Sequence, residues 1–149
     1  KKLIDYRSKE GSETEKDFRN KISLIKNSLS NIESIEKERI SKKREKLLNE
    51  LKKVTLEIDN NRLEQEMIYF LEKFDINEEI IRLKSNFLIF EETLESNDPV
   101  GKKLSFVCQE IGREINTIGS KANDGDLQKH VIEMKDNLEK IKENILNIL

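Results

Sequence analysis

The sequence contains little of what several functional classes need: among its 149 residues there are one Cys, one His, one Pro and no Trp. A single Cys cannot form an internal disulfide, and one Cys with one His cannot supply the four ligands of a structural zinc site. A hydrolase of the Ser-His-Asp or Cys-His type would depend entirely on His130. No apolar run approaches the roughly 20 residues of a transmembrane helix, so we expect no membrane partner.

Charge is abundant but almost balanced. Lys and Arg number 28 and Asp and Glu 30, which gives a formal charge of −2. This total does not indicate nucleic-acid binding, although a near-neutral sum can conceal separate positive and negative surfaces. The basic run at 42–44 is flanked by glutamates on both sides, so it is typical of a mixed, solvated helix face.

The apolar residues recur at intervals of three and four along almost the whole chain, which is the pattern of amphipathic helices. Strand-like alternation and hairpin turns are absent from the sequence. We therefore expect an all-α fold of five or six helices, arranged as long helical hairpins. The Phe residues are assigned to the core. The apolar stripes begin at Phe18, Leu47, Leu63, Ile76, Leu104 and Leu127.

The first two stripes lie in a segment without Gly or Pro from residue 12 to residue 58. Ile32 and Leu47 are fifteen residues apart, one more than two heptads, so the stripe changes phase within the charged stretch 36–46. This predicts either one long helix with a stutter or two helices with a bend. A helix of about 40 residues would measure about 60 Å and would project from the domain. We expect a helical arm at 1–58 and a helical domain at 59–149.

Turn and cap signals divide the rest of the chain. Asp-Asn-Asn at 59–61 and Asp-Ile-Asn at 75–77 each indicate a helix start, and Asn-Asp-Pro at 97–99 indicates a helix end followed by a new helix. The Gly- and Ser-containing stretch 119–125 is typical of a connection between helices. These signals separate the expected helices.

Two acidic groups are candidates for chemistry. Glu110 and Glu114 share a helix face, with Arg113 beside it. Carboxylate pairs can bind Mg²⁺ or Mn²⁺ and activate water, while Arg can hold a phosphate oxygen. Glu78 and Glu79 follow a helix start. The alternatives are a solvated face for the first group, and capping with dipole compensation for the second.

The segment 99–124 carries a more specific signal. It reads Pro-Val-Gly-Lys-Lys-Leu-Ser-Phe and continues to Gln-Glu-Ile-Gly-Arg-Glu-Ile-Asn-Thr-Ile-Gly-Ser-Lys-Ala-Asn-Asp. This resembles the C-terminal signature of the YicC/YloC family of bacterial endoribonucleases, PVGRKLDFLxQEMNREANTxxSKxxD. Segments at 7–11, 62–66 and 75–85 resemble other family motifs, in order and without large gaps.

The resemblance implies a cytoplasmic, metal-dependent endoribonuclease that assembles as a ring-like hexamer and works with RNA and other RNA-degradation enzymes. It also implies that the chain is the C-terminal part of a larger protein, because family members begin with a β-rich domain. The expected catalytic residues are Glu110, Arg113 and Glu114. The expected RNA contacts are Lys102, Lys103, Asn116, Lys121 and Arg82. The expected ligands of Mg²⁺ or Mn²⁺ are Glu110, Glu114, Asp124, Glu78 and Glu79.

Three residues depart from the family pattern: Asn86 replaces a His, Ser105 an Asp, and Gly112 an Asn. An Asn side chain cannot transfer protons near neutral pH, so any mechanism through that His is in doubt. A non-catalytic helical adaptor that binds RNA or an RNA-degrading partner is therefore the first alternative. A plain coiled-coil scaffold is the second, although segment 99–124 is unusually polar for one.

Overall fold

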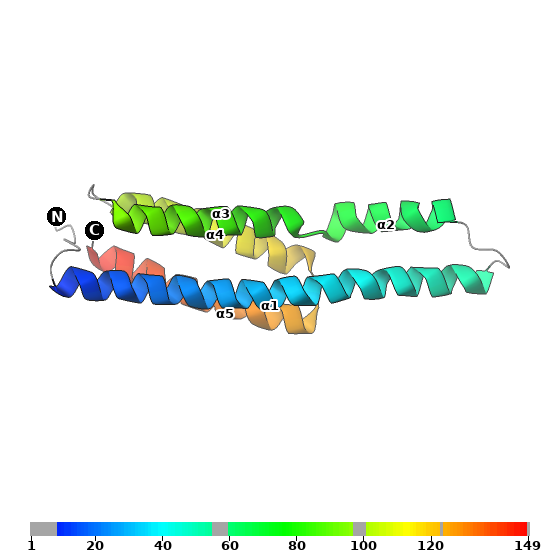
Figure 1. Cartoon of the computed structure of the whole chain (residues 1–149), viewed down its shortest axis with the longest axis horizontal. Helices are drawn as coiled ribbons and strands as arrows, with labels where there is room; N and C mark the ends of the chain where they lie inside the picture. Colours follow the sequence, from blue (N-terminus) through cyan, green and yellow to red (C-terminus); the bar gives the residue numbers. More distant parts are fainter. Residues whose placement is uncertain (1–8, 55–59, 97–100, 123, 149) are drawn as a thin grey trace.

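The fold is all-α, as the apolar periodicity predicts. The computed structural model describes residues 9–54, 60–96, 101–122 and 124–148, and these residues contain five helices and no strand. No helix in these ranges is long and apolar enough to cross a membrane. The expected caps at 59 and 97–99 lie outside the described residues. The helices are α1 (Lys9–Val54), α2 (Asn60–Phe74), α3 (Asn77–Glu95), α4 (Gly101–Lys121) and α5 (Gly125–Ile148) (Figure 1).

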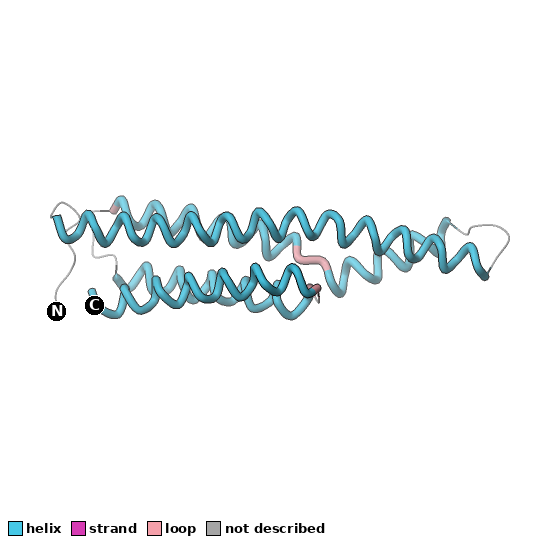
Figure 2. Tube along the Cα trace, turned by 90° about the horizontal axis from the view of Figure 1, so that it is seen from below, coloured by secondary structure: helices cyan, strands magenta, loops and turns pink. Residues whose placement is uncertain are grey.

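The helices form a four-helix bundle that continues into a two-helix arm. The N-terminal half of α1 packs against α5 and α3, and α4 lies against both α3 and α5. The C-terminal half of α1 extends beyond the bundle, where α2 is the one described helix beside it (Figure 2). Helix α1 is continuous over 46 residues, or roughly 70 Å at 1.5 Å per residue. Of the two alternatives that the sequence leaves open, the structure shows one continuous helix over Lys9–Val54, and the expected end of the arm at 55–58 lies outside the described residues.

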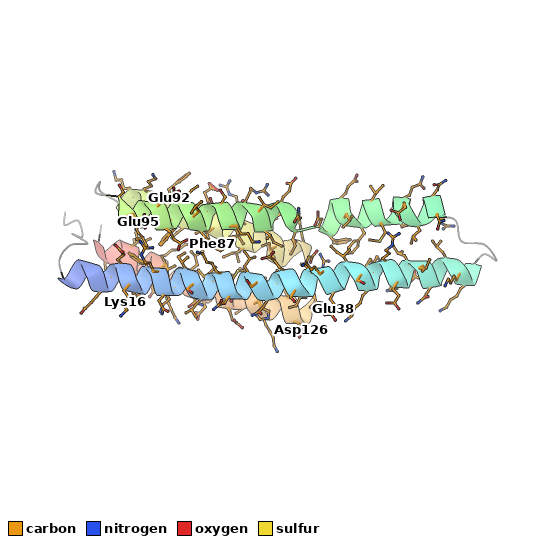
Figure 3. The ribbon with its side chains drawn as sticks, viewed as in Figure 1. Lys16, Glu38, Phe87, Glu92, Glu95 and Asp126 are labelled. Carbon is orange, nitrogen blue, oxygen red and sulfur yellow. The ribbon has the colours of Figure 1, made fainter. Side chains whose placement is uncertain are left out.

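Two separate apolar cores hold the bundle and the arm. In the bundle, Phe18 of α1 and Phe90 of α3 meet edge to face, with ring centroids 6.0 Å apart, and Phe87 points from α3 toward α1 (Figure 3). In the arm, a second cluster joins α1 to α2. Burial of these stripes is the main stabilising term. The arm core consists of Leu47, Leu51, Leu63 and Met67.

The boundary between the two cores lies inside α1. Ile35 packs against the bundle core and Ile40 against the arm core. The first half of α1 therefore packs with the bundle and its second half packs with α2 in the arm, so one helix serves both cores. The expected division into 1–58 and 59–149 stays a prediction.

A buried ion pair marks this boundary. Arg39 donates two hydrogen bonds of 2.8 Å to the carboxylate of Glu36, and its Nη2 donates a third, also 2.8 Å, to the backbone oxygen of Phe74. The guanidinium lies 5.4 Å from the ring centroid of Phe70. Arg39 thus ties α1 to the last turn of α2. The phase change of the apolar stripe falls in the same place.

Gly112 offers a test of the bundle packing. A Cβ at this position would lie 3.4 Å from Leu138 Cδ2, an ordinary van der Waals contact. Since Gly weakens a helix interior, we expect Gly112→Ala to raise the free energy of unfolding by about 0.5–1 kcal/mol. At Gly119 the Cβ would lie only 3.2 Å from Val131 Cγ1, so Gly119→Ala should gain less. Urea unfolding measures both, and a loss of stability in Gly112→Ala would contradict the packing.

Candidate active site

The candidate site lies where α3 and α4 run side by side in opposite directions. Arg82 of α3 contacts Glu114 of α4, and Lys121, seven residues later on α4, contacts the backbone of Asp75, which lies seven residues before Arg82, in the link that leads into α3. These two contacts define the register between the helices. As a result, the C-terminal half of α4, which carries part of the signature, lies beside the first turns of α3, which carry Glu78 and Glu79.

Arg82 is the centre of a group of charged side chains. Its Nε donates to Glu114 Oε2 at 3.0 Å, its Nη1 to Glu78 Oε2 at 3.2 Å and its Nη2 to Glu79 Oε2 at 3.2 Å. Lys121 Nζ donates to the same Glu79 oxygen at 3.1 Å. We call these five residues the Arg82 cluster. It contains three carboxylates and two cations.

The members of the cluster differ in burial. The Glu79 side chain is 3% exposed, whereas that of Arg82 is 49% exposed. The hydrogen bond to Glu114 raises the pKa of the Arg82 guanidinium above its ordinary value, despite an opposing effect of desolvation. Glu79 Oε1 is buried and has no hydrogen-bond partner among the described residues. Buried carboxylates therefore hold a permanently charged guanidinium with one edge toward solvent.

Capping explains only part of this arrangement. Asp75 Oδ1 accepts a hydrogen bond of 3.1 Å from the backbone N–H of Asn77, but the N-cap residue of α3 is Ile76, which provides no side-chain cap. Glu78 and Glu79 lie in the first turn of α3, where the helix dipole favours them. The dipole alone does not require Glu79 to be buried against Arg82 and Lys121.

Glu110 and Arg113 lie outside the cluster but next to it. Glu110 is half-buried one turn before Glu114, and its Oε2 is 3.7 Å from Nη1 of Arg113, whose side chain is 73% exposed. Asn86 follows Arg82 by one turn on α3. The register of the helices therefore places Asn86 and Glu110 at the same level, one turn beyond the pair of Arg82 and Glu114.

The expected metal ligands are not gathered into a metal site within the described ranges. No group of three or more His, Cys, Asp or Glu side chains there could hold a metal ion. Glu78, Glu79 and Glu114 do converge, but on the guanidinium of Arg82. Asp124 instead caps α5, since its Oδ1 accepts from the backbone N–H of Asp126 at 3.0 Å and of Leu127 at 3.1 Å. Within the described residues these side chains are therefore engaged by cations and backbone N–H groups and not gathered as a three-ligand set, and the metal requirement stays a prediction.

The expected RNA contacts are spread over α3 and α4. Arg82 and Lys121 belong to the cluster, and Lys121 is already held by Glu79. Lys102 and Lys103 are exposed in the first turn of α4. Asn116 is exposed, and its backbone oxygen accepts a hydrogen bond of 3.0 Å from Ser120. The structure therefore brings together only part of the expected set.

Sequence analysis missed one residue on this face. Phe106, assigned to the core with the other Phe residues, is 60% exposed. It precedes Glu110 by four residues and Arg113 by seven, so the three share a helix face. Its departure from the three-four spacing of Leu104, Val107 and Cys108 could have revealed it. Cys108 is buried as expected, and burial raises the pKa of its thiol to about 12.

The fold and the site define a class of protein: an all-α bundle with a projecting arm and a partly buried carboxylate–guanidinium cluster between α3 and the signature helix α4. The family model described as "Endoribonuclease YicC-like, C-terminal" matches residues 25–149. The chain belongs to this family of YicC-like endoribonucleases, which confirms the resemblance seen in the sequence.

Two curated relatives carry the name "Probable endoribonuclease YicC". The protein of Clostridioides difficile (strain 630) is 40% identical over 150 residues, which cover 99% of this chain and 51% of the relative. The protein of Haemophilus influenzae (strain ATCC 51907 / DSM 11121 / KW20 / Rd) is 36% identical over 105 residues, or 70% of this chain and 37% of the relative. The chain thus spans about half the length of the relatives, or less.

Proposed function

We propose that this chain is the C-terminal helical part of an endoribonuclease that cleaves RNA. The observation that carries the proposal is the Arg82 cluster, in which the signature residue Glu114 is paired with Arg82 across two helices. The family membership and the relatives' printed names support RNA as the substrate.

Arg82 and Arg113 are assigned to the phosphate. Cleavage of a phosphodiester develops negative charge on the phosphoryl oxygens, and fixed guanidinium groups stabilise that charge. Glu114 and Glu79 hold Arg82 from the buried side, so that little reorganisation is needed when RNA binds. Arg113 lies on α4 and its side chain is more exposed than that of Arg82, so it can contact the phosphate first.

Glu110 is assigned as the group that accepts the proton of the attacking oxygen. It is half-buried beside Arg113 and is not part of the Arg82 cluster, so within the described part of the chain its carboxylate has one ion-pair partner, which is exposed. The residue at the same level on α3 is Asn86, which can orient a phosphate or a hydroxyl but cannot exchange a proton. Glu110 is assigned this role because Glu114, the other carboxylate of the α4 signature, is already engaged by Arg82.

Metal dependence and hexamer assembly remain predictions from the sequence. Because the described residues contain no three-ligand site, no step of the proposed reaction passes through Mg²⁺ or Mn²⁺. An ion required for activity would be held by fewer than three of the described side chains together with water and RNA phosphates, or by residues elsewhere in the protein. Light scattering of the full-length protein measures whether the predicted ring-like hexamer forms.

A non-catalytic RNA-binding adaptor is the second candidate. Asn86 in place of the family His favours it, and so does the engagement of Glu79 and Glu114 by cations. An adaptor would use the same arginines to bind RNA and would leave the strand intact.

The proposed function is tested by incubating the full-length protein with a labelled RNA hairpin and a labelled single strand. Parallel reactions contain Mn²⁺, Mg²⁺ or EDTA. We expect internal cleavage products, and their dependence on the added ion measures the predicted metal requirement. A salt-sensitive RNA shift without products in any reaction would favour the adaptor. If the protein neither bound nor cleaved RNA, the endoribonuclease and the adaptor would both be rejected.

A further inference from the structure

The positive charge of this protein is concentrated in the arm. Residues 37–53 of α1 contain eight Lys and Arg against three Glu, a formal charge of +5, whereas the rest of the chain carries −7. The net charge of −2 therefore conceals a basic segment. Because this segment lies beyond the four-helix bundle, its field is not cancelled by neighbouring helices other than α2 (Figure 2).

Three lysines form a line on the outer side of the arm. Glu38 points away from α2 (Figure 3), and Lys42 follows it by four residues on the same side of α1. Lys46 and Lys53 continue the line at helical spacing, over roughly 16 Å between Lys42 and Lys53. We call Lys42, Lys46 and Lys53 the lysine line. They line a shallow surface depression together with Glu45, Asn49 and Glu50.

The lysine line is available for a ligand. Lys46 and Lys53 are exposed and form no ion pair with any residue that the structure describes. Lys42 lies 3.9 Å from Glu38, and both side chains are at least 70% exposed, a pair of the kind that contributes little. The two arginines of the segment are engaged instead. Arg39 is held by Glu36, and Arg44 donates to Glu64 at 2.6 Å.

The chemistry of this surface fits a polyanion better than a protein. Cores of protein interfaces are enriched in aromatic and large apolar residues and depleted of Lys and Glu. The large exposed apolar residues of the arm, Ile68 and Tyr69, belong to α2, and none is found on α1 between 37 and 53. The depression is lined by three lysines and one Asn, residue types that commonly contact nucleic-acid phosphates, and by two glutamates, so that cations outnumber carboxylates.

We propose that the lysine line binds the phosphate backbone of RNA and holds the strand along the arm, away from the Arg82 cluster. This inference rests on the proposed action on RNA and adds a binding surface to it. The contacts are to phosphates, so they supply affinity and carry no base specificity. The arm then guides RNA, while the bundle carries the chemistry.

The test compares full-length protein with the variant Lys42→Gln/Lys46→Gln/Lys53→Gln. Binding to a labelled single-stranded RNA with methylated ribose hydroxyls, which resists attack by those hydroxyls, is measured over a range of salt concentrations. Since each lost phosphate contact on a single strand removes about 0.7 from the slope of log K against log salt, the slope should fall by about 2. At low salt the affinity should fall by roughly tenfold or more.

The control variant is Lys16→Gln/Lys135→Gln/Lys140→Gln, which removes the same charge from exposed bundle lysines. Lys16 lies at the end of α1 opposite the arm (Figure 3). The control variant should keep the wild-type slope of log K against log salt. An equal effect of both variants would mean that net charge alone matters, and would overturn the proposal.

The remaining outcomes separate the two proposals. Wild-type binding that is unchanged in the arm variant would overturn the lysine line and leave the proposed function standing. A changed oligomeric state of the arm variant with unchanged RNA binding would identify the surface as a protein interface. That result would also overturn the proposal that the lysine line binds RNA. If the wild-type protein neither binds nor cleaves RNA, the proposed function fails, and the lysine line fails with it.

Discussion

Replacing Glu110 by Gln is expected to lower the rate of RNA cleavage by roughly 10²- to 10⁴-fold, the usual effect of removing a general base. Gln preserves the size of the side chain but cannot accept a proton. Glu110 is half-buried, and among the described residues its ion-pair partner is the exposed Arg113 alone, so folding should be preserved. Single-turnover cleavage of the labelled hairpin, with circular dichroism as the folding check, measures the effect.

The matched control for Glu110 is Glu139→Gln, the same change at an exposed position of α5, which should cleave at the wild-type rate. Arg113→Lys is a second informative variant, because an ammonium keeps the charge but loses the planar fork that contacts phosphate oxygens in pairs. A Glu110→Gln protein that is folded and fully active would remove Glu110 from the site. A loss shared equally by Glu139→Gln would point to an effect of charge alone.

Replacing Arg39 by Ala is expected to lower the free energy of unfolding by about 3 kcal/mol, because it leaves the buried Glu36 carboxylate without its partner. The variant also loses the hydrogen bond to the Phe74 backbone oxygen and the contact with the Phe70 ring. The arm should therefore loosen first. Urea unfolding of the 149-residue chain measures the loss, and hydrogen exchange in α2 locates it.

Two variants serve as controls for Arg39. Lys42→Ala removes a neighbouring exposed cation and should change the unfolding free energy by less than about 0.5 kcal/mol. Arg39→Ala combined with Glu36→Gln should recover part of the stability, because the unpaired charge is gone. If Arg39→Ala were as stable as Lys42→Ala, the Arg39 contacts would not be what holds α2 to α1.

Local periodicity determined much of the helical structure. Each apolar stripe of the sequence became the buried face of a helix, since the repeat of 3.6 residues depends only on neighbouring positions. The same rule applied strictly would have identified Phe106 as exposed, because it lies two residues after Leu104 and outside the stripe. The signature at 99–124 was likewise sufficient to find the family.

Contacts between helices required the tertiary structure. Arg82 and Glu114 are 32 residues apart, and nothing in either helix alone specifies that they meet. Their pairing follows from the register of α3 against α4, which the packing of the apolar faces sets. The same holds for Arg39, whose charged surroundings in the sequence indicate a solvated face, although α2 covers it.

The sequence by itself thus determined the helices, their inner faces and the family of the protein, because these depend on local spacing and on residue identity. Only the tertiary structure decided which charges are buried, which carboxylates meet a guanidinium, and where the bundle ends and the arm begins. The physical reason is that charge pairing and burial depend on the neighbouring helix, whose position is fixed by the core as a whole.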